Sequence, residues 1–274
     1  MRVINTIAEL RKELADQRGV VLVPTMGNLH DGHLSLVKIA RARDACVVTS
    51  IFVNPLQFAP HEDFAEYPRT LERDCAELSA AGTDIVFAPT VEEIYPETQV
   101  TTLHPPSDLA DILEGQVRPG FFRGVCTVVL KLFNIVQPKI AVFGRKDYQQ
   151  QLIISNMIRQ LALPIELIAG DIVRDTTGLS LSSRNSYLTE SQRVEAAQLN
   201  RALCTVVAAI RAGRTDWSVI EQLAVASLRA RGWQPDYVSI RRRDNLAIPA
   251  AGVPMVVLGA ARIGGIRLID NVEL

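Results

Sequence analysis

Two histidines that lie three residues apart, His30 and His33, are the residues best placed to do chemistry. They flank Gly32 in PTMGNLHDGH, where a short apolar run gives way to an amphipathic pattern. A glycine there lets backbone N–H groups approach an oxyanion, and imidazoles can donate hydrogen bonds to phosphoryl oxygens. The pattern therefore favours a polyphosphate site at which histidine stabilises charge on the α-phosphate of ATP and on the departing pyrophosphate.

Other interpretations of the histidine pair stay open at this point. The imidazoles could cap a helix or line a core, or they could bind zinc as an HxxH pair. Zinc would need a third and a fourth ligand, and the sequence offers no Cys/His cluster to supply them. Neither GxxxxGK[ST] nor GxGxxG occurs, so the sequence supports neither a P-loop nor an ordinary dinucleotide site.

Two further segments carry groups that suit a phosphate. In FGRKDYQQQ, Lys146 offers a point charge, Asp147 could meet a ribose hydroxyl or cap a helix, and Gln150 lies one turn along. The serine-rich segment LSLSSRN, at 179–185, supplies two hydroxyls and one guanidinium that could close over a leaving pyrophosphate. An exposed turn and an ordinary polar loop are the alternatives for these two segments.

Neutral polar side chains suggest a second kind of ligand. Asn54 and Gln57 lie between apolar residues in FVNPLQF, and uncharged donors and acceptors suit a hydroxylated organic substrate better than a phosphate. The loop LEGQVRPGFFRG adds Glu114, Arg118 and Arg123, which could contact a substrate or simply be solvated.

The elements that must hold these residues are strands alternating with helices. Apolar, β-branched runs typical of buried parallel strands occur at 20–24, 46–53, 84–89, 140–144 and 165–170. Amphipathic patterns lie between them, and this alternation predicts an α/β fold with a doubly wound, Rossmann-like parallel sheet. In such a sheet, ligands bind at the carboxyl ends of the strands, which is where the polar segments fall.

The pattern changes after residue 174. Thr189 and Gln192 form a capping box that begins one long helix ending at Gly213, and a second helix and three strand-like runs follow. We therefore expect two domains, a Rossmann-like catalytic domain over residues 1–174 and a smaller α+β C-terminal lid domain over residues 175–274.

Composition excludes several classes of protein. The 274 residues include 29 basic and 30 acidic side chains, so a net charge of −1 gives no broad basic surface for nucleic acid or an anionic membrane. The four cysteines are too scattered for a CxxC pair, and the N-terminal residues lack the apolar block of a signal peptide. We expect a cytoplasmic protein that acts on small molecules, with no nucleic-acid and no membrane partner.

Together these residues resemble one family, pantothenate synthetase, the AMP-forming pantoate:β-alanine ligase of the HxGH nucleotidyltransferase superfamily. The resemblance covers nearly the whole chain, through VPTMGNLHDGH, SIFVNPLQF, YPRT, FAP, EIYP, LEG, RPG, FRGV, KLFN, QP, KDYQQ, LSSRN, YLT and RLIDN. It implies the condensation of (R)-pantoate with β-alanine to pantothenate, AMP and pyrophosphate through a pantoyl adenylate, in vitamin B5 and coenzyme A biosynthesis.

The resemblance also implies which residues act. His33 would be the proton donor, and charge that develops during transfer would be stabilised by His30, Lys146, Ser182, Ser183 and Arg184. The residues implied in binding ATP are Met26, Gly27, Asn28, Leu29, His30, Asp31, Gly32, His33, Gly144, Arg145, Lys146, Asp147, Val173, Leu181, Ser182, Ser183 and Arg184.

The remaining implied contacts concern the other substrates and the metal. Gln57 and Gln150 would hold pantoate, with Asn54 beside them and β-alanine approaching near Gln57. Mg²⁺ would accompany the triphosphate of ATP, with Asp74 as a metal or outer contact. The family resemblance also implies a homodimer.

Two positions depart from the family's pattern. Arg145 stands where an acidic residue often precedes Lys-Asp, and Phe121 stands where a histidine commonly precedes Phe-Arg-Gly. Either change could alter a contact to substrate or to a loop.

Three other functions would make different demands on the sequence. A nucleotidylyltransferase with a phosphorylated product would need basic groups in its acceptor pocket, whereas Gln57 and Gln150 are neutral. A nucleotide-sensing module would bind without turnover. An RNA-charging enzyme of the same superfamily would need a basic surface and an anticodon-reading extension, and the sequence has neither.

Overall fold

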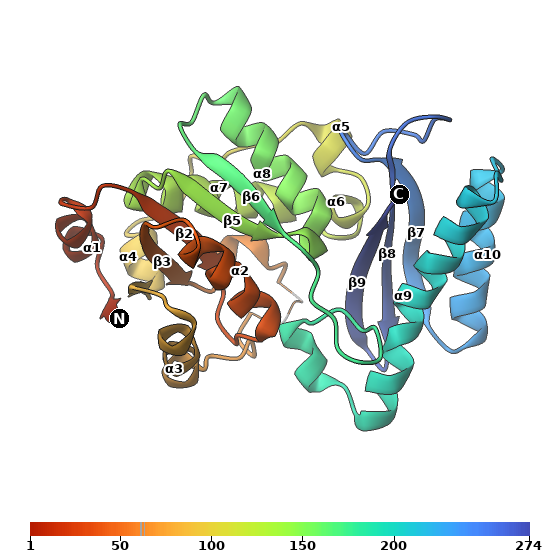
Figure 1. Cartoon of the computed structure of the whole chain (residues 1–274), viewed down its shortest axis with the longest axis horizontal. Helices are drawn as coiled ribbons and strands as arrows, with labels where there is room; N and C mark the ends of the chain where they lie inside the picture. The colour runs from red at the N-terminus through yellow and green to blue at the C-terminus, as the bar shows by residue number, and fades with distance from the viewer. Residues whose placement is uncertain (61, 63) are drawn as a thin grey trace. The chain divides into compact units, whose positions relative to one another are not determined.

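The computed structural model describes residues 1–60, 62 and 64–274. The chain divides into two compact units (Figure 1). The first unit comprises Met1–Arg145 and Ile153–Asp171, and the second comprises Lys146–Leu152 and Ile172–Leu274. The short segment Lys146–Leu152 therefore groups with the second unit, whereas the expected boundary near residue 174 leaves it in the first.

A six-stranded parallel sheet forms the centre of the first unit, and it confirms the predicted doubly wound α/β fold. The strand order is β1-β4-β3-β2-β5-β6, so the winding direction reverses between β2 and β5. The strands are β1 (Arg2–Ile4), β2 (Val20–Thr25), β3 (Cys46–Ile51), β4 (Ile85–Phe87), β5 (Ile140–Gly144) and β6 (Glu166–Gly170).

Helices cover both faces of this sheet. Val21 and Val23 of β2 are fully buried in one apolar cluster with residues of α2 and α3. Leu22 points to the opposite face and is fully buried as well. The helices are α1 (Ile7–Leu14), α2 (Asp31–Arg41), α3 (Leu71–Ala81), α4 (Val91–Ile94), α5 (Ser107–Ala110), α6 (Glu114–Val117) and α7 (Phe121–Val136), with the 3-10 turn η1 (Pro55–Gln57).

Both units contribute residues to α8 (Tyr148–Gln160), which follows the 3-10 turn η2 (Arg145–Asp147). Among the described residues, no helix combines the length and the apolar character needed to cross a bilayer.

The second unit contains a three-stranded antiparallel sheet, as the predicted small α+β domain requires. Helices α9 and α10 pack on it (Figure 1), and α9 begins at the predicted capping box of Thr189 and Gln192. A side chain at Gly259 would lie 2.9 Å from Leu203, so this glycine lets α9 approach the sheet. The elements are η3 (Ser183–Tyr187), α9 (Glu190–Arg211), α10 (Trp217–Ala230), β7 (Gln234–Arg242), β8 (Met255–Ile263) and β9 (Ile266–Glu273).

Candidate active site

The histidine pair lies at the turn that leads from β2 into α2. His30 is the N-cap of α2, and its Nδ1 accepts a hydrogen bond from the backbone N–H of Gly32 at 3.1 Å. Because Nδ1 is an acceptor here, a neutral His30 carries its proton on Nε2. The ring centroids of His30 and His33 are 4.1 Å apart, so the two imidazoles lie side by side at the beginning of the helix. Both imidazoles can therefore act on one ligand at this turn.

The backbone before the histidines has an unusual conformation. Gly27 and Asn28 both have left-handed backbone angles, with φ values of 80° and 50°. A Cβ atom on Gly27 would lie 3.1 Å from Oδ2 of Asp74 and 3.1 Å from Ile51, so glycine fits both the conformation and the space. The N–H of Gly27 donates to Oγ1 of Thr25 at 3.2 Å, which fixes the end of the strand to the turn.

Asp74, which belongs to α3, holds this turn through hydrogen bonds to its backbone. Its side chain is fully buried, and its oxygens accept from the backbone N–H groups of Asn28 at 2.8 Å and Leu29 at 3.0 Å. The hydroxyl of Thr70 donates to Oδ2 at 3.0 Å, and Arg73 lies 3.5 Å from Oδ1. A buried carboxylate needs such partners to offset its lost hydration. These contacts give Asp74 the role of an anchor for the histidine turn.

The same contacts bear on the implied magnesium site. Within residues 1–60, 62 and 64–274, no group of three or more His, Cys, Asp or Glu side chains is arranged to hold a metal ion. Both oxygens of Asp74 already accept hydrogen bonds from the turn. The described side chains therefore do not fit a metal site made by the protein itself.

A saturated hydrogen-bond network surrounds Asn54. Its amide nitrogen donates to Oε1 of Gln57 and to the carbonyl oxygen of Gly124, both at 3.2 Å. Its oxygen accepts from the hydroxyl of Tyr95 at 2.8 Å and from the N–H of Leu56 at 3.3 Å. Burial raises the pKa of Tyr95, so this hydroxyl keeps its proton and remains a donor. All four hydrogen-bonding positions of the Asn54 carboxamide are used, which gives it a supporting role for Gln57.

Gln57 links this network to the histidine turn. Because its Oε1 accepts from Asn54, its Nε2 is the end that faces the turn, and it lies 2.9 Å from the sulfur of Met26. The glutamine expected to bind an organic acid and the segment expected to bind ATP therefore adjoin within the first unit.

Two contacts from other elements fix η1, the turn that carries Gln57. Arg118 forms a two-pronged ion pair with Glu62, at 2.7 and 2.8 Å, and donates to the carbonyl oxygen of Gln57 at 3.2 Å. The centroid of the Phe121 ring lies 3.8 Å from the guanidinium carbon of Arg118. At Gly124 of α7, a Cβ atom would lie only 2.1 Å from the carbonyl oxygen of Leu56, so α7 can pack here only without a side chain.

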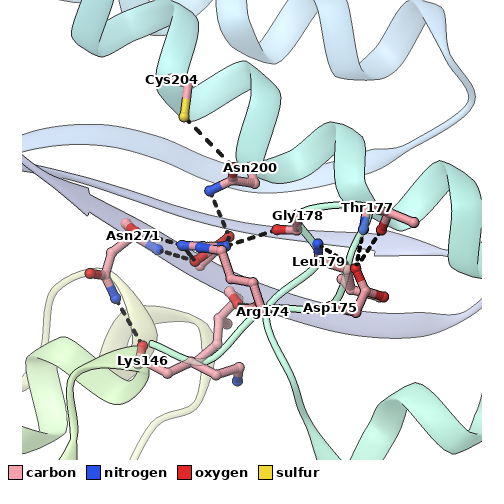
Figure 2. A network of polar contacts seen from close by, with 12 residues as sticks. Lys146, Arg174, Asp175, Thr177, Gly178, Leu179, Asn200, Cys204 and Asn271 are labelled. Carbon is pink, nitrogen blue, oxygen red and sulfur yellow. Dashed lines mark hydrogen bonds and ion pairs between the residues drawn. The ribbon is translucent and has the colours of Figure 1, made fainter. Parts of the chain in front are cut away.

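The second unit carries the other expected phosphate-binding residues. Lys146 is half-buried in η2, and its carbonyl oxygen accepts from the side-chain amide of Asn271 at 3.0 Å (Figure 2). The backbone N–H of Leu181 donates to the carbonyl oxygen of Val173 at 3.0 Å. Ser182 caps η3, with its Oγ accepting from the N–H of Arg184 at 3.3 Å.

Three further expected residues lie in η2 and in the first turn of α8. Gln150 is half-buried in the first turn of α8, and Asp147 is exposed. Arg145 pairs at 3.7 Å with Asp171, whose side chain is 93% exposed.

Sequence reasoning assigned no role to three residues that support the site. Tyr95 and Asn271 belong to the motifs EIYP and RLIDN, and Arg174 belongs to no motif. Tyr95 contacts Asn54, Asn271 contacts Lys146, and Arg174 pairs with Asp270. These contacts connect positions far apart in the chain, so only the motif matches pointed to the first two residues.

The fold and the site together define a class of protein. In this doubly wound parallel sheet, two adjacent imidazoles follow one of the central strands, and an oriented carboxamide contacts the turn that carries them, as in α/β enzymes that act on a nucleotide and a small polar substrate. The family model described as Pantoate-beta-alanine ligase matches residues 2–273. The chain belongs to the pantoate-beta-alanine ligase family.

Solved structures of similar proteins agree with this assignment. Two structures from Thermus thermophilus, described as pantothenate synthetase, are 46% identical to this chain, cover 100% of it and 99% of their own chains, and have TM-scores of 0.93 and 0.92. A pantoate-beta-alanine ligase from Francisella tularensis, complexed with beta-gamma ATP and β-alanine, is 31% identical, covers 100% of this chain and 97% of its own, and has a TM-score of 0.81. The protein is thus a ligase that forms pantothenate from pantoate and β-alanine with ATP, as the sequence predicted.

Asp74→Asn tests the anchoring of the histidine turn. The variant replaces one acceptor oxygen with an amide that cannot accept, so a buried N–H loses its partner, at a cost of about 1–3 kcal/mol. We expect kcat/KM for ATP to fall roughly 10- to 100-fold, measured over a range of Mg²⁺ concentrations. The control is Asp84→Asn. Asp84 also accepts a hydrogen bond from a backbone N–H, that of Val47, but it lies before β4 at the amino end of the sheet. Full recovery of activity at high Mg²⁺ would contradict the anchoring role.

Gly124→Ala tests the close approach of α7 to η1. The added methyl group would force the two elements apart at a cost of about 1–3 kcal/mol. We expect a higher KM for pantoate, because Gln57 moves with η1, and a lower melting temperature. Gly19→Ala is the matched control, since its new methyl group would meet its nearest neighbour at 3.7 Å. An unchanged KM for pantoate in Gly124→Ala would show that Gln57 does not depend on this contact.

Proposed function

We propose that the ligase reaction proceeds through a pantoyl adenylate. The carboxylate of (R)-pantoate attacks the α-phosphorus of ATP and displaces pyrophosphate. The amine of β-alanine then attacks the acyl carbon, loses a proton and expels AMP. The observation that carries the proposal is the contact between Gln57 and Met26, because it brings the acid-binding carboxamide to the nucleotide-binding turn. Holding both reactants in one place removes much of the entropy cost of their encounter, at best about 7–11 kcal/mol.

In the first unit, we assign the proton donor and its neighbours to the turn after β2. His33 donates to an oxygen of the reacting phosphate, and His30 donates through the proton on its Nε2. The other proposed ATP-binding residues of this unit are Met26, Gly27, Asn28, Leu29, Asp31, Gly32, Gly144 and Arg145. Gln57 presents its amide N–H groups to the carboxylate or a hydroxyl of pantoate, and β-alanine approaches near the same residue.

In the second unit, we assign cationic and hydroxyl groups to the phosphates. Lys146 and Arg184 offset the negative charge of the triphosphate, and the hydroxyls of Ser182 and Ser183 donate to its oxygens. Each well-placed donor is worth about 3 kcal/mol when charge develops only during transfer. The remaining proposed contacts are Asp147 to the ribose, Gln150 to pantoate, and Val173 and Leu181 to the nucleotide.

The Francisella tularensis relative supports the substrate assignment, because its structure holds beta-gamma ATP and β-alanine. We extend both ligands to this chain. Mg²⁺ is proposed to enter with ATP, bound by phosphate oxygens and water, because the oxygens of Asp74 already serve the histidine turn. A cytoplasmic homodimer is the proposed state of the protein, and free thiols at all four cysteines suit a reducing compartment.

Omission of each substrate in turn tests the adenylate pathway. We expect AMP to form only when ATP, pantoate and β-alanine are all present. Exchange of labelled pyrophosphate into ATP should need pantoate but not β-alanine, because the adenylate forms first. A requirement for β-alanine in the exchange reaction would contradict the two-step pathway.

His33→Ala tests the role of the proton donor. We expect pantoate-dependent pyrophosphate release to fall about 10²- to 10⁴-fold, because general acid catalysis is lost. The dissociation constant for ATP, measured by calorimetry, should change much less. His104→Ala removes an exposed histidine outside the turn and serves as the control. Equal losses in binding and in turnover would mean that His33 binds ATP without acting on the transition state.

A further inference from the structure

Arg174, Asn200 and Asn271 belong to one polar network in the second unit (Figure 2), and each of them donates a hydrogen bond to a buried carboxylate near the end of the chain. Asp270 of β9 is 3% exposed, and its two oxygens accept from the guanidinium of Arg174 at 2.6 and 2.9 Å. The side-chain amide of Asn200 adds a third hydrogen bond at 3.2 Å, and the backbone N–H of Asn271 adds a fourth at 2.8 Å. These partners hold both the carboxylate and the guanidinium in one orientation.

Arg174 closes a small hairpin that leads to residues 182–184, which we call the serine segment. The backbone of Arg174 forms an isolated antiparallel bridge with Ser180, and its guanidinium also donates to the carbonyl oxygen of Gly178 at 3.1 Å. At the tip, Asp175 accepts from Thr177 at 2.6 and 2.8 Å and from the N–H of Leu179 at 3.1 Å. Burial works to raise the pKa of Asp175, but these hydrogen bonds outweigh it and hold the pKa below its ordinary value. The tip is therefore tied by a charged acceptor at neutral pH.

The serine segment is held at both of its ends. Before it, the hydroxyl of Ser180 donates to the carbonyl oxygen of Ile269 on β9 at 3.4 Å. After it, the side-chain amide of Asn185 donates back to the carbonyl oxygen of Ser180 at 3.0 Å. Residues 182–184 thus lie between Ser180, which bonds to β9, and Asn185, which bonds back to Ser180.

The next residue of β9 holds the lysine. The side-chain amide of Asn271 donates to the carbonyl oxygen of Lys146 at 3.0 Å (Figure 2). Successive side chains of a strand point to opposite faces, so Asp270 and Asn271 can serve two different segments from one position. Through Asn271, β9 contacts Lys146 directly, and through Asp270 it holds Arg174, whose hairpin leads to residues 182–184.

We infer that Asp270 and Asn271 are positioning residues that set the ammonium group of Lys146 and residues 182–184 at a fixed spacing. The inference rests on the proposed function, in which these groups offset the charge of the triphosphate. A charged donor lowers the barrier only when it is already in place as charge develops, because its reorganisation would otherwise cost part of the gain. Asp270 acts through Arg174 and the hairpin, and Asn271 acts through the backbone of Lys146.

A double-mutant cycle between Asn271 and Lys146 tests the inference. Asn271→Ala removes the bond to the Lys146 carbonyl, and we expect kcat for pantoate-dependent pyrophosphate release to fall about 10- to 100-fold. The KM for pantoate should stay within about threefold in this variant, because its binding glutamines are unaltered. In a Lys146→Ala background the same change should cost less than about threefold, because the residue that Asn271 positions is already absent.

Controls separate positioning from general damage. Asn271→Asp is isosteric but cannot donate to the carbonyl oxygen, so it should reproduce the loss even if Asn271→Ala folds poorly. Asn245→Ala, at an exposed turn of the same unit, should leave kcat unchanged. The melting temperature of each variant is measured alongside its kinetics.

Two outcomes would overturn the inference in distinguishable ways. If each single change lowers kcat and the two fold-losses multiply in the double variant, Asn271 does not act through Lys146. Full activity of Lys146→Ala would instead contradict the role proposed for the lysine, and the positioning with it. The same cycle between Asp270→Asn and Arg184→Ala tests the hairpin arm, where losses that multiply would remove Asp270 from the inference.

Discussion

A buried carboxylate that holds a turn in a left-handed conformation is the constraint on which the first unit's site depends. Asn28 adopts a φ of 50°, which a residue with a side chain rarely takes, and the bond from its N–H to Asp74 offsets that cost. Because Asp74 lies on α3, the position of the turn depends on how that helix packs. Leu78 of α3 is fully buried in the same apolar cluster as Val37 of α2. Core packing thus fixes the carboxylate, the carboxylate fixes the turn, and the turn fixes the histidines.

In each unit, side chains of that unit hold the polar segments that carry the proposed functional groups. The proposed functional groups lie on short polar segments, and such segments have few regular backbone hydrogen bonds to hold them in place. In the first unit, Asn54 and Tyr95 orient the carboxamide of Gln57. In the second, Asn271 bonds to the backbone of Lys146. Neutral amides suit this task, because a carboxamide both donates and accepts while adding no charge that would compete with an anionic substrate.

The amino-acid sequence predicted the sheet and the histidine turn well, because both leave local patterns. Apolar, β-branched runs marked five of the six parallel strands, but β1 was missed because only Ile4 of its three residues is buried. The supporting contacts could not be read in the same way. Asp74 lies 46 positions from Asn28, Tyr95 lies 41 from Asn54, and Asn271 lies 125 from Lys146. No periodicity connects such pairs, so the sequence assigned Asp74 only the role of a metal or outer contact and assigned the other two no role.

The two departures from the family's pattern have unequal consequences, and the reason is burial. Arg145 pairs with an aspartate whose side chain is 93% exposed, and an exposed ion pair contributes little to stability. Phe121 instead lies against the guanidinium of Arg118, whose side chain is only 15% exposed and also pairs with Glu62. An aromatic face on one side and a carboxylate on the other leave Arg118 few rotamers, so its bond to the carbonyl oxygen of Gln57 costs little further entropy. The departure at Phe121 therefore acts on η1, the turn that carries Gln57, whereas the ion pair of Arg145 with Asp171 adds little to stability.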